Sequence, residues 1–66
     1  MHKYKMVKHH GYVWFEITHK QRFDNIGLWI ALQEFRYWCE TTGETTQFKV
    51  TYRNLKATQE LLDLWL

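Results

Sequence analysis

The sequence has no proline, three glycines and a single cysteine among its 66 residues. One cysteine cannot close an internal disulfide, and no paired Cys/His spacing of the zinc-finger type occurs. No uncharged apolar run reaches the ~18 residues of a membrane-spanning helix, and residues 1–20 lack the apolar core of a signal peptide. We therefore expect a protein of the cytoplasm, or of the host-cell cytoplasm if it is viral, with no membrane contact and no disulfide.

Aromatic side chains are abundant instead, at 18% of the chain with four Trp. A chain this short buries only ~60% of the surface that its unfolded form exposes, so its core is marginal. Each aromatic ring can remove ~150–250 Å² from water, which compensates for the small size. With no linker, repeat or low-complexity tract, residues 1–66 are predicted to form one small domain.

Charge is uneven although the net value is only +2. Residues 1–22 hold five Lys or Arg against Glu16 alone, while the remaining chain is slightly acidic. The amino-terminal part is therefore predicted to present a basic surface.

Two alternating apolar runs flank His10-Gly11, which predicts a hairpin over residues 3–18 with a two-residue loop. This register places Lys5 opposite Glu16 and separates two faces. The apolar face collects Tyr4, Met6, Val13, Phe15 and Ile17. The other face collects Lys3, Lys5, Val7, His9, Tyr12, Trp14 and Glu16.

Three further elements complete the expected order. A helix is predicted over residues 24–41, with Asp24 as N-cap, Phe23 packed on Leu28, and Gly43 just beyond its end. A strand over residues 46–53 would turn Phe48, Val50 and Tyr52 inward, and a second helix would span residues 55–66. The predicted fold is α+β, with ββαβα order, a three-stranded antiparallel sheet and the long helix on one sheet face.

The predicted long helix carries apolar residues on two sides. One stripe, facing the sheet, holds Leu28, Ala31, Leu32, Phe35, Trp38 and Cys39; a second holds Ile26, Ile30 and Tyr37, flanked by Trp29. One sheet cannot bury both stripes. The second could be covered by the C-terminal helix, by another copy of the chain or by a different protein, and the C-terminal helix could instead cover the sheet face of Tyr12 and Trp14.

Surplus apolar surface favours a non-enzymatic protein-binding module, because exposed patches on small proteins usually mark contact sites. Trp, Tyr and Arg dominate such contacts, so the predicted binding residues are Trp29, Tyr37, Arg36, Ile30 and Trp14, with Trp65 as a weaker candidate. The layout over residues 3–53, a hairpin, one long helix and a returning strand, resembles that of several small phage proteins that inhibit host enzymes by binding them. This resemblance matches no sequence motif, and it implies an inhibitor. Formation of a homodimer is a further alternative.

Single-stranded nucleic-acid binding is the alternative function. The outer sheet face would combine basic residues for phosphates with rings for stacking on bases: Lys3, Lys5, Tyr12, Trp14, Lys49 and Arg53. A net charge of only +2, with Glu16 in the middle of that face, favours the protein-binding interpretation.

Catalysis, cofactors and metals find little support. Cys39 is expected in the core, where a thiol is a poor nucleophile, and no phosphate-binding loop or Ser/His/Asp arrangement occurs. His2 and His19 would lie opposite each other at the hairpin rim, but zinc needs three or four ligands. We expect no catalytic residue, no cofactor and no metal site.

Overall fold

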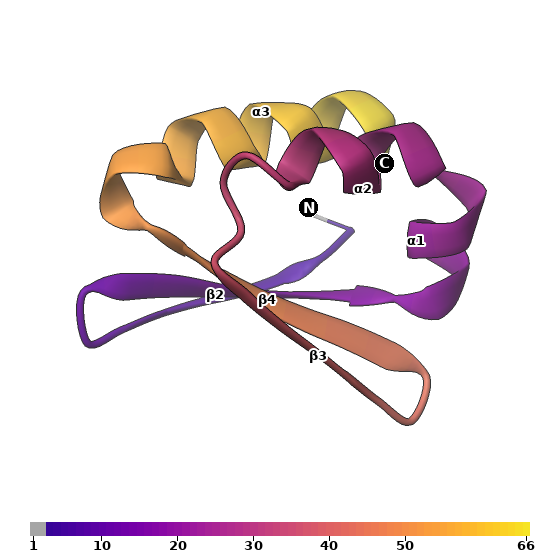
Figure 1. The fold of residues 1–66 in the computed structure, drawn as a ribbon, viewed down its shortest axis with the longest axis horizontal. Coiled ribbons are helices and arrows are strands. Elements are labelled where there is room, and N and C mark those ends of the chain that lie inside the picture. Colours follow the sequence, from indigo (N-terminus) through magenta and orange to yellow (C-terminus); the bar gives the residue numbers. More distant parts are fainter. Residues whose placement is uncertain (1–2) are drawn as a thin grey trace.

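The computed structural model describes residues 3–66, which form a sheet with helices along one side (Figure 1). The elements in chain order are β1 (Lys5–His9), β2 (Tyr12–Thr18), α1 (His19–Asp24), α2 (Ile26–Leu32), β3 (Trp38–Thr42), β4 (Thr45–Thr51), the 3-10 turn η1 (Tyr52–Asn54) and α3 (Leu55–Trp65). The α+β class is confirmed, but the described sheet has four strands and the predicted ββαβα order is not the one observed.

The sheet is antiparallel throughout, with the strand order β1-β2-β4-β3. The β1–β2 hairpin has the predicted register, in which Lys5 lies opposite Glu16 and His9 opposite Tyr12. Its loop residues His10 and Gly11 both have positive φ, 49° and 82°, as a two-residue hairpin turn of type I′ requires. The strand predicted over residues 46–53 is present as β4 but ends at Thr51, so Tyr52 and Arg53 belong to η1 and not to the sheet.

The helix predicted over residues 24–41 is wrong in its second half. Helix α2 ends at Leu32, and residues 38–42 form β3, a strand additional to the three predicted, which pairs with β4. Aromatic and β-branched residues fill this stretch, and such side chains fit a pleated surface better than a helix. The helical interpretation depended on Gly43 as a helix end, but Gly43 has φ 57° in the two-residue turn between β3 and β4. Both roles need a positive φ, so the glycine alone does not distinguish them.

The start of the helical region is also different from the prediction. Thr18 caps α1: its Oγ1 accepts a hydrogen bond from the Gln21 amide at 3.0 Å, and Gln21 Oε1 accepts one from the Thr18 amide at 2.8 Å. This is the capping box that the sequence Thr-x-x-Gln encodes. Asp24, the predicted N-cap, is instead the last residue of α1, and Phe23 is 61% exposed and therefore not packed into the core.

All helices lie over the same face of the sheet, as Figure 1 shows. Side chains from β2 and β4 alternate between buried and half-buried, and the buried set meets Leu28, Leu32 and Leu62 from the helices. Helix α3 therefore shares the inner face with α2 and leaves the Tyr12/Trp14 face uncovered. The predicted burial of Cys39 and Tyr52 is wrong: Cys39 lies opposite Phe48 on the inner face but is exposed on the edge strand β3, and Tyr52 is 47% exposed.

The two halves of the chain repeat one backbone plan. Strand β3 starts at Trp38, 33 residues after β1 starts at Lys5, and β4 follows β2 by the same spacing. Each hairpin is followed by helix, and the equivalent residues Phe15 and Phe48 lie opposite each other at the centre, with rings stacked 5.3 Å apart. The repeat is one of backbone, because few side chains match at this spacing.

Candidate functional site

The outer face of the sheet, which none of the helices within residues 3–66 covers, is the candidate site and is called the open face below. The strand register arranges its side chains in cross-strand rows. One row holds Lys5, Glu16, Gln47 and Glu40; the next holds Val7, Trp14, Lys49 and Trp38; a third holds His9, Tyr12 and Thr51. The central row is thus apolar and aromatic, with one cation in its middle.

Three rings surround that cation, and a fourth, Tyr37, packs on one of them. Together they form the ring cluster: Tyr12, Trp14, Tyr37 and Trp38. Trp14 and Trp38 meet edge to face with centroids 5.0 Å apart, and Tyr12 and Tyr37 lie 5.4 Å apart. The Lys49 ammonium lies 4.7 Å from the Tyr12 ring centroid and 5.2 Å from that of Trp14, within cation–π range. A hydrogen bond to Tyr12 raises the pKa of Tyr37 above its ordinary value. These contacts hold the rings in place on a surface that faces solvent.

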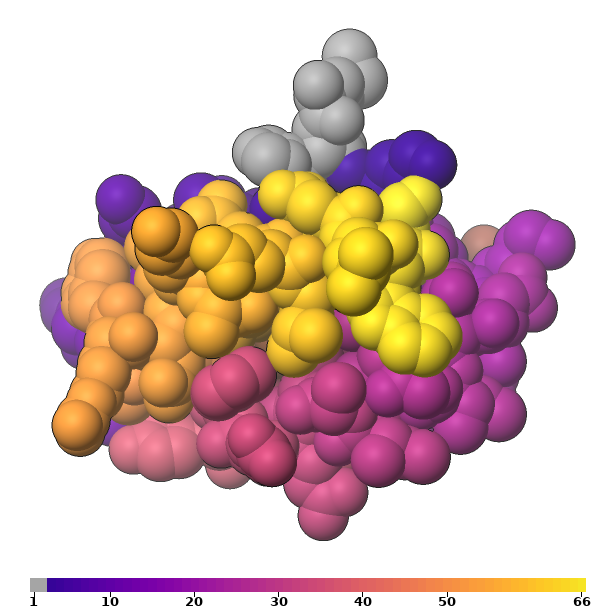
Figure 2. All heavy atoms as spheres, turned by 90° about the horizontal axis from the view of Figure 1, so that it is seen from above, coloured from indigo at the N-terminus to yellow at the C-terminus, as the bar shows by residue number. Residues whose placement is uncertain are grey.

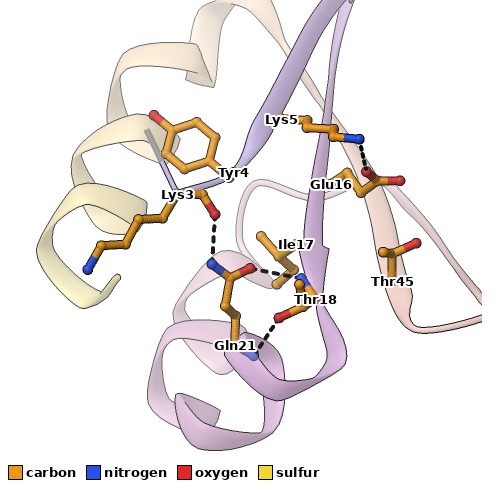
Figure 3. A pocket seen from close by; sticks show the side chains of 8 residues that line it. All are labelled: Lys3, Tyr4, Lys5, Glu16, Ile17, Thr18, Gln21 and Thr45. Carbon is orange, nitrogen blue, oxygen red and sulfur yellow. Dashed lines mark hydrogen bonds and ion pairs between the residues drawn. The ribbon is translucent and has the colours of Figure 1, made fainter. Parts of the chain in front are cut away.

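The row beside the ring cluster is polar and internally paired. Gln47 Nε2 donates to Glu16 Oε1 at 3.1 Å, and Lys5 Nζ lies 3.5 Å from Glu16 Oε2. Figure 3 shows the ion pair of Lys5 with Glu16. The hydrogen bond from Gln47 lowers the pKa of Glu16, and the charge of Lys5 lowers it further. With Lys5 and Lys49 balanced by Glu16 and Glu40, these two rows carry no net charge.

The five predicted protein-binding residues do not form one surface. Trp14 and Tyr37 both belong to the ring cluster, which the sequence did not predict because it placed them on different elements. Trp29 packs edge-on against the buried Phe48, with centroids 5.7 Å apart. The guanidinium carbons of Arg22 and Arg36 lie 4.5 and 4.0 Å from the Trp29 ring centroid. Ile30 is 61% exposed on α2, in the helix layer.

The alternative nucleic-acid set is also divided. Tyr12, Trp14 and Lys49 lie together in the ring cluster. Lys3 Nζ instead donates to the Leu66 carbonyl at 2.6 Å. With Lys5 paired to Glu16, and Arg53 in η1, Lys49 is the one basic residue of this set that lies among the rings.

Trp38 is the main member of the site that the sequence analysis missed, since it was assigned to the core stripe of a helix. Residues 38–42, Trp-Cys-Glu-Thr-Thr, show no apolar–polar alternation, so spacing gave no signal for a strand. Only the strand-favouring residue types Trp and Thr before Gly43 pointed to one.

The helix layer carries a second apolar surface, seen from above in Figure 2, where α3 is orange to yellow and α2 magenta to pink. Between these helices lies an open groove of about 470 Å³, lined by Ala31, Glu34, Phe35, Ala57, Glu60, Leu61 and Leu64. At the far end, the Trp65 ring lies against Gly27 so closely that a Cβ there would be 2.5 Å from Trp65 Cη2. Gly27 therefore allows α3 to approach α2.

A further depression of about 420 Å³ lies between Tyr4, Gln21 and Thr45, and Figure 3 shows its lining. Its polar groups serve the fold, because Gln21 both closes the α1 capping box and donates to the Lys3 carbonyl at 2.7 Å. His2, considered with His19 as a start of a metal site, lies outside the described residues. Among residues 3–66, no three His, Cys, Asp or Glu side chains gather as metal ligands, and no helix is long and apolar enough to span a membrane.

Comparison with known proteins gives no relative from which a function could be transferred. No family model, curated protein or solved structure matches the chain. The open face must therefore be interpreted from its own chemistry.

Proposed function

We propose that this chain is a non-enzymatic protein-binding module whose contact surface is the open face, centred on the ring cluster. The observation that carries the proposal is the clustering of four Trp and Tyr rings on a sheet face that the chain's own helices leave uncovered. Trp and Tyr are the residue types that contribute most to protein–protein binding energy. The absence of net charge in the two central rows also suits a surface that must lose its water on binding.

The ring cluster is preorganised for such a contact. Tyr12, Trp14 and Trp38 are half-buried, because each leans on a neighbouring ring or on the Lys49 side chain. Rings that are already held in place lose less conformational entropy when a partner covers them. Val7, 61% exposed, and Tyr37, 59% exposed, extend the apolar area on either side.

The proposal is tested by protein capture with a matched pair of tyrosine variants. Tyr37→Ala removes an exposed ring from the cluster, whereas Tyr52→Ala removes a similarly exposed ring from η1, outside the open face. We expect immobilised wild-type protein to capture a partner from cell lysate at both low and about 0.5 M salt, where the screening length is about 4 Å. Tyr37→Ala should lose this partner and Tyr52→Ala should keep it. Equal capture by both variants would contradict the proposal. Inhibition of an enzyme would be one consequence of such binding. The identity of the captured partner shows whether that partner is an enzyme.

Single-stranded nucleic acid is a second candidate, because Lys49 sits among rings that could stack on bases. Binding of this kind predicts affinity for a labelled oligothymidine that falls steeply with the logarithm of salt concentration. It also predicts that Lys49→Gln weakens binding of the oligothymidine. Lys56→Gln, at an exposed position of α3, should leave this affinity unchanged. Fluorescence anisotropy across a salt series separates this candidate from the first.

A further inference from the structure

We propose that the partner of the open face is a second copy of this chain, packed face to face about a two-fold axis that runs parallel to the strands between β2 and β4. This inference rests on the proposed function and names its partner. It follows from the order of residues across the sheet, which makes the open face complementary to itself.

Rotation about this axis places each cross-strand row of one chain over the same row of the second chain, in the opposite order. Strand β1 of one chain then faces β3 of the other, and β2 faces β4. The resulting facing pairs are Lys5 with Glu40, Glu16 with Gln47, Val7 with Trp38, Trp14 with Lys49, and Tyr12 with Thr51. A cation thus faces an anion, an acceptor faces an amide, and an apolar side chain faces a ring. Trp14 supplies a further cation–π partner for the Lys49 ammonium of the other copy.

The other face-to-face arrangement lacks this complementarity. A two-fold axis perpendicular to the strands pairs each strand with itself, and centred on the ring cluster it would place Lys49 on Lys49 of the second copy. Like charges brought together in a desolvated contact strongly oppose association. The row order therefore selects the axis parallel to the strands.

The area of the open face suits a weak, reversible dimer. Four strands ~4.8 Å apart, each five to seven residues long, give a flat footprint of roughly 400 Å² before side-chain relief is added. Interfaces below ~1,200 Å² in total are typical of transient association. We expect a dissociation constant on the order of 10–100 µM.

Charge reversal across the proposed axis provides the test. Lys5 and Glu40 stand on the two edge strands of one chain, three strand spacings or ~14 Å apart, so they cannot pair within a chain. In the dimer each Lys5 meets Glu40 of the second copy, and this contact occurs twice. Lys5→Glu and Glu40→Lys should each raise the dissociation constant roughly tenfold, and the double variant should recover most of the loss.

Sedimentation equilibrium from about 10 µM to about 1 mM measures the association. The matched control is Lys5→Glu with Glu60→Lys, which restores the same net charge through an exposed residue of α3, away from the open face. This control should not rescue the dimer. Circular dichroism at low concentration checks that each variant is folded. Lys5→Glu also breaks the pair of Lys5 with Glu16 inside the chain. Glu40→Lys alone therefore serves as a charge reversal that leaves this pair intact.

Three results would overturn the inference: a monomer over the whole concentration range, a dimer insensitive to both reversals, or equal rescue by Glu60→Lys. A monomer that still captures a different protein through Tyr37 leaves the proposed function standing. A monomer whose Tyr37→Ala variant captures the same proteins as wild type removes both proposals, so the two failures are distinguishable.

Discussion

The two faces of the sheet are built from the same strands and have opposite relations to water. The inner face consists of Val13, Phe15 and Ile17 from β2 and their neighbours on β4, with at most 2% of each side chain exposed. On the outer face Tyr12 and Trp14, from the same strand, stay half-exposed.

The difference lies in the chemistry of the rings. The inner rings at the sheet centre are Phe, which has no polar atom that would need a partner when buried. The outer rings are Trp and Tyr, whose polar ends tolerate water while the rest of the ring remains available for contact. The comparison indicates that one face stabilises the monomer, whereas the other is suited to a contact made after folding.

Phe15→Ala should have the largest effect, because Phe15 is 1% exposed and stacks on Phe48 at the centre of the core. Removal of such a ring costs about 3–5 kcal/mol. A 66-residue chain has a total stability of only ~3–10 kcal/mol, so the variant should lose a large share of it and unfold at a much lower urea concentration. Urea unfolding followed by circular dichroism measures this, with Phe15→Leu as the milder variant. A loss below about 1 kcal/mol would show that the inner face is not the core.

Trp14→Ala, the neighbouring residue on the outer face, should cost less in spite of removing a larger side chain. Trp14 is half-buried, and its main contacts are Trp38 and Lys49. An aromatic pair and an exposed cation–π contact together account for about 1–2 kcal/mol. The variant should remain folded, with its melting temperature lowered by roughly 5–15 °C, and it should lose the binding proposed for the open face. If Trp14→Ala unfolds the chain as Phe15→Ala does, the two faces do not divide stability from binding.

Short-range patterns in the sequence predicted the parts of the fold that depend on neighbouring residues. Strict alternation around His10-Gly11 gave the β1–β2 register and the pair of Lys5 with Glu16. The apolar spacing after Asn54 gave α3. In both cases one periodicity fits the stretch and the other does not.

The failure over residues 24–41 has a physical cause. Leu28 and Leu32 do lie on one face of α2, but the apolar residues that follow fit either a helical stripe or an alternating strand. The choice is made by pairing with β4, where the Tyr37 amide donates to the Lys49 carbonyl at 3.0 Å. This is a tertiary contact that local spacing does not reveal.

The candidate site was predicted in part for the same reason. Tyr12 and Trp14 could be placed on the outer face because their hairpin was correctly interpreted. Trp38 and Tyr37 could not be placed there without β3, so the ring cluster as a whole was invisible from the sequence. The predicted anchor Trp29 proves to support the core, through its contact with Phe48.

Gln47→Val should have the smallest effect on stability, and it sharpens the comparison because it alters only the polar row of the open face. Gln47 donates to the Glu16 carboxylate, and this bond is the largest cause of the lowered pKa of Glu16. A group whose folded-state pKa is lowered contributes stability above its unfolded pKa, about 4.5, and this contribution disappears as the pH falls through the lower folded value.

Loss of the hydrogen bond from Gln47 should therefore raise the pKa of Glu16, measured by the carboxylate carbon shift in an NMR titration. Gln47→Val should therefore destabilise the chain more at pH 7 than at pH 3. The control is Gln59→Val, in the helix layer, which should leave the Glu16 titration unchanged. An unaltered Glu16 titration in Gln47→Val would mean that Lys5 and Thr45, without Gln47, hold the carboxylate in its charged form. The polar row would then depend on a solvent-exposed ion pair and would be a weaker frame for the ring cluster beside it.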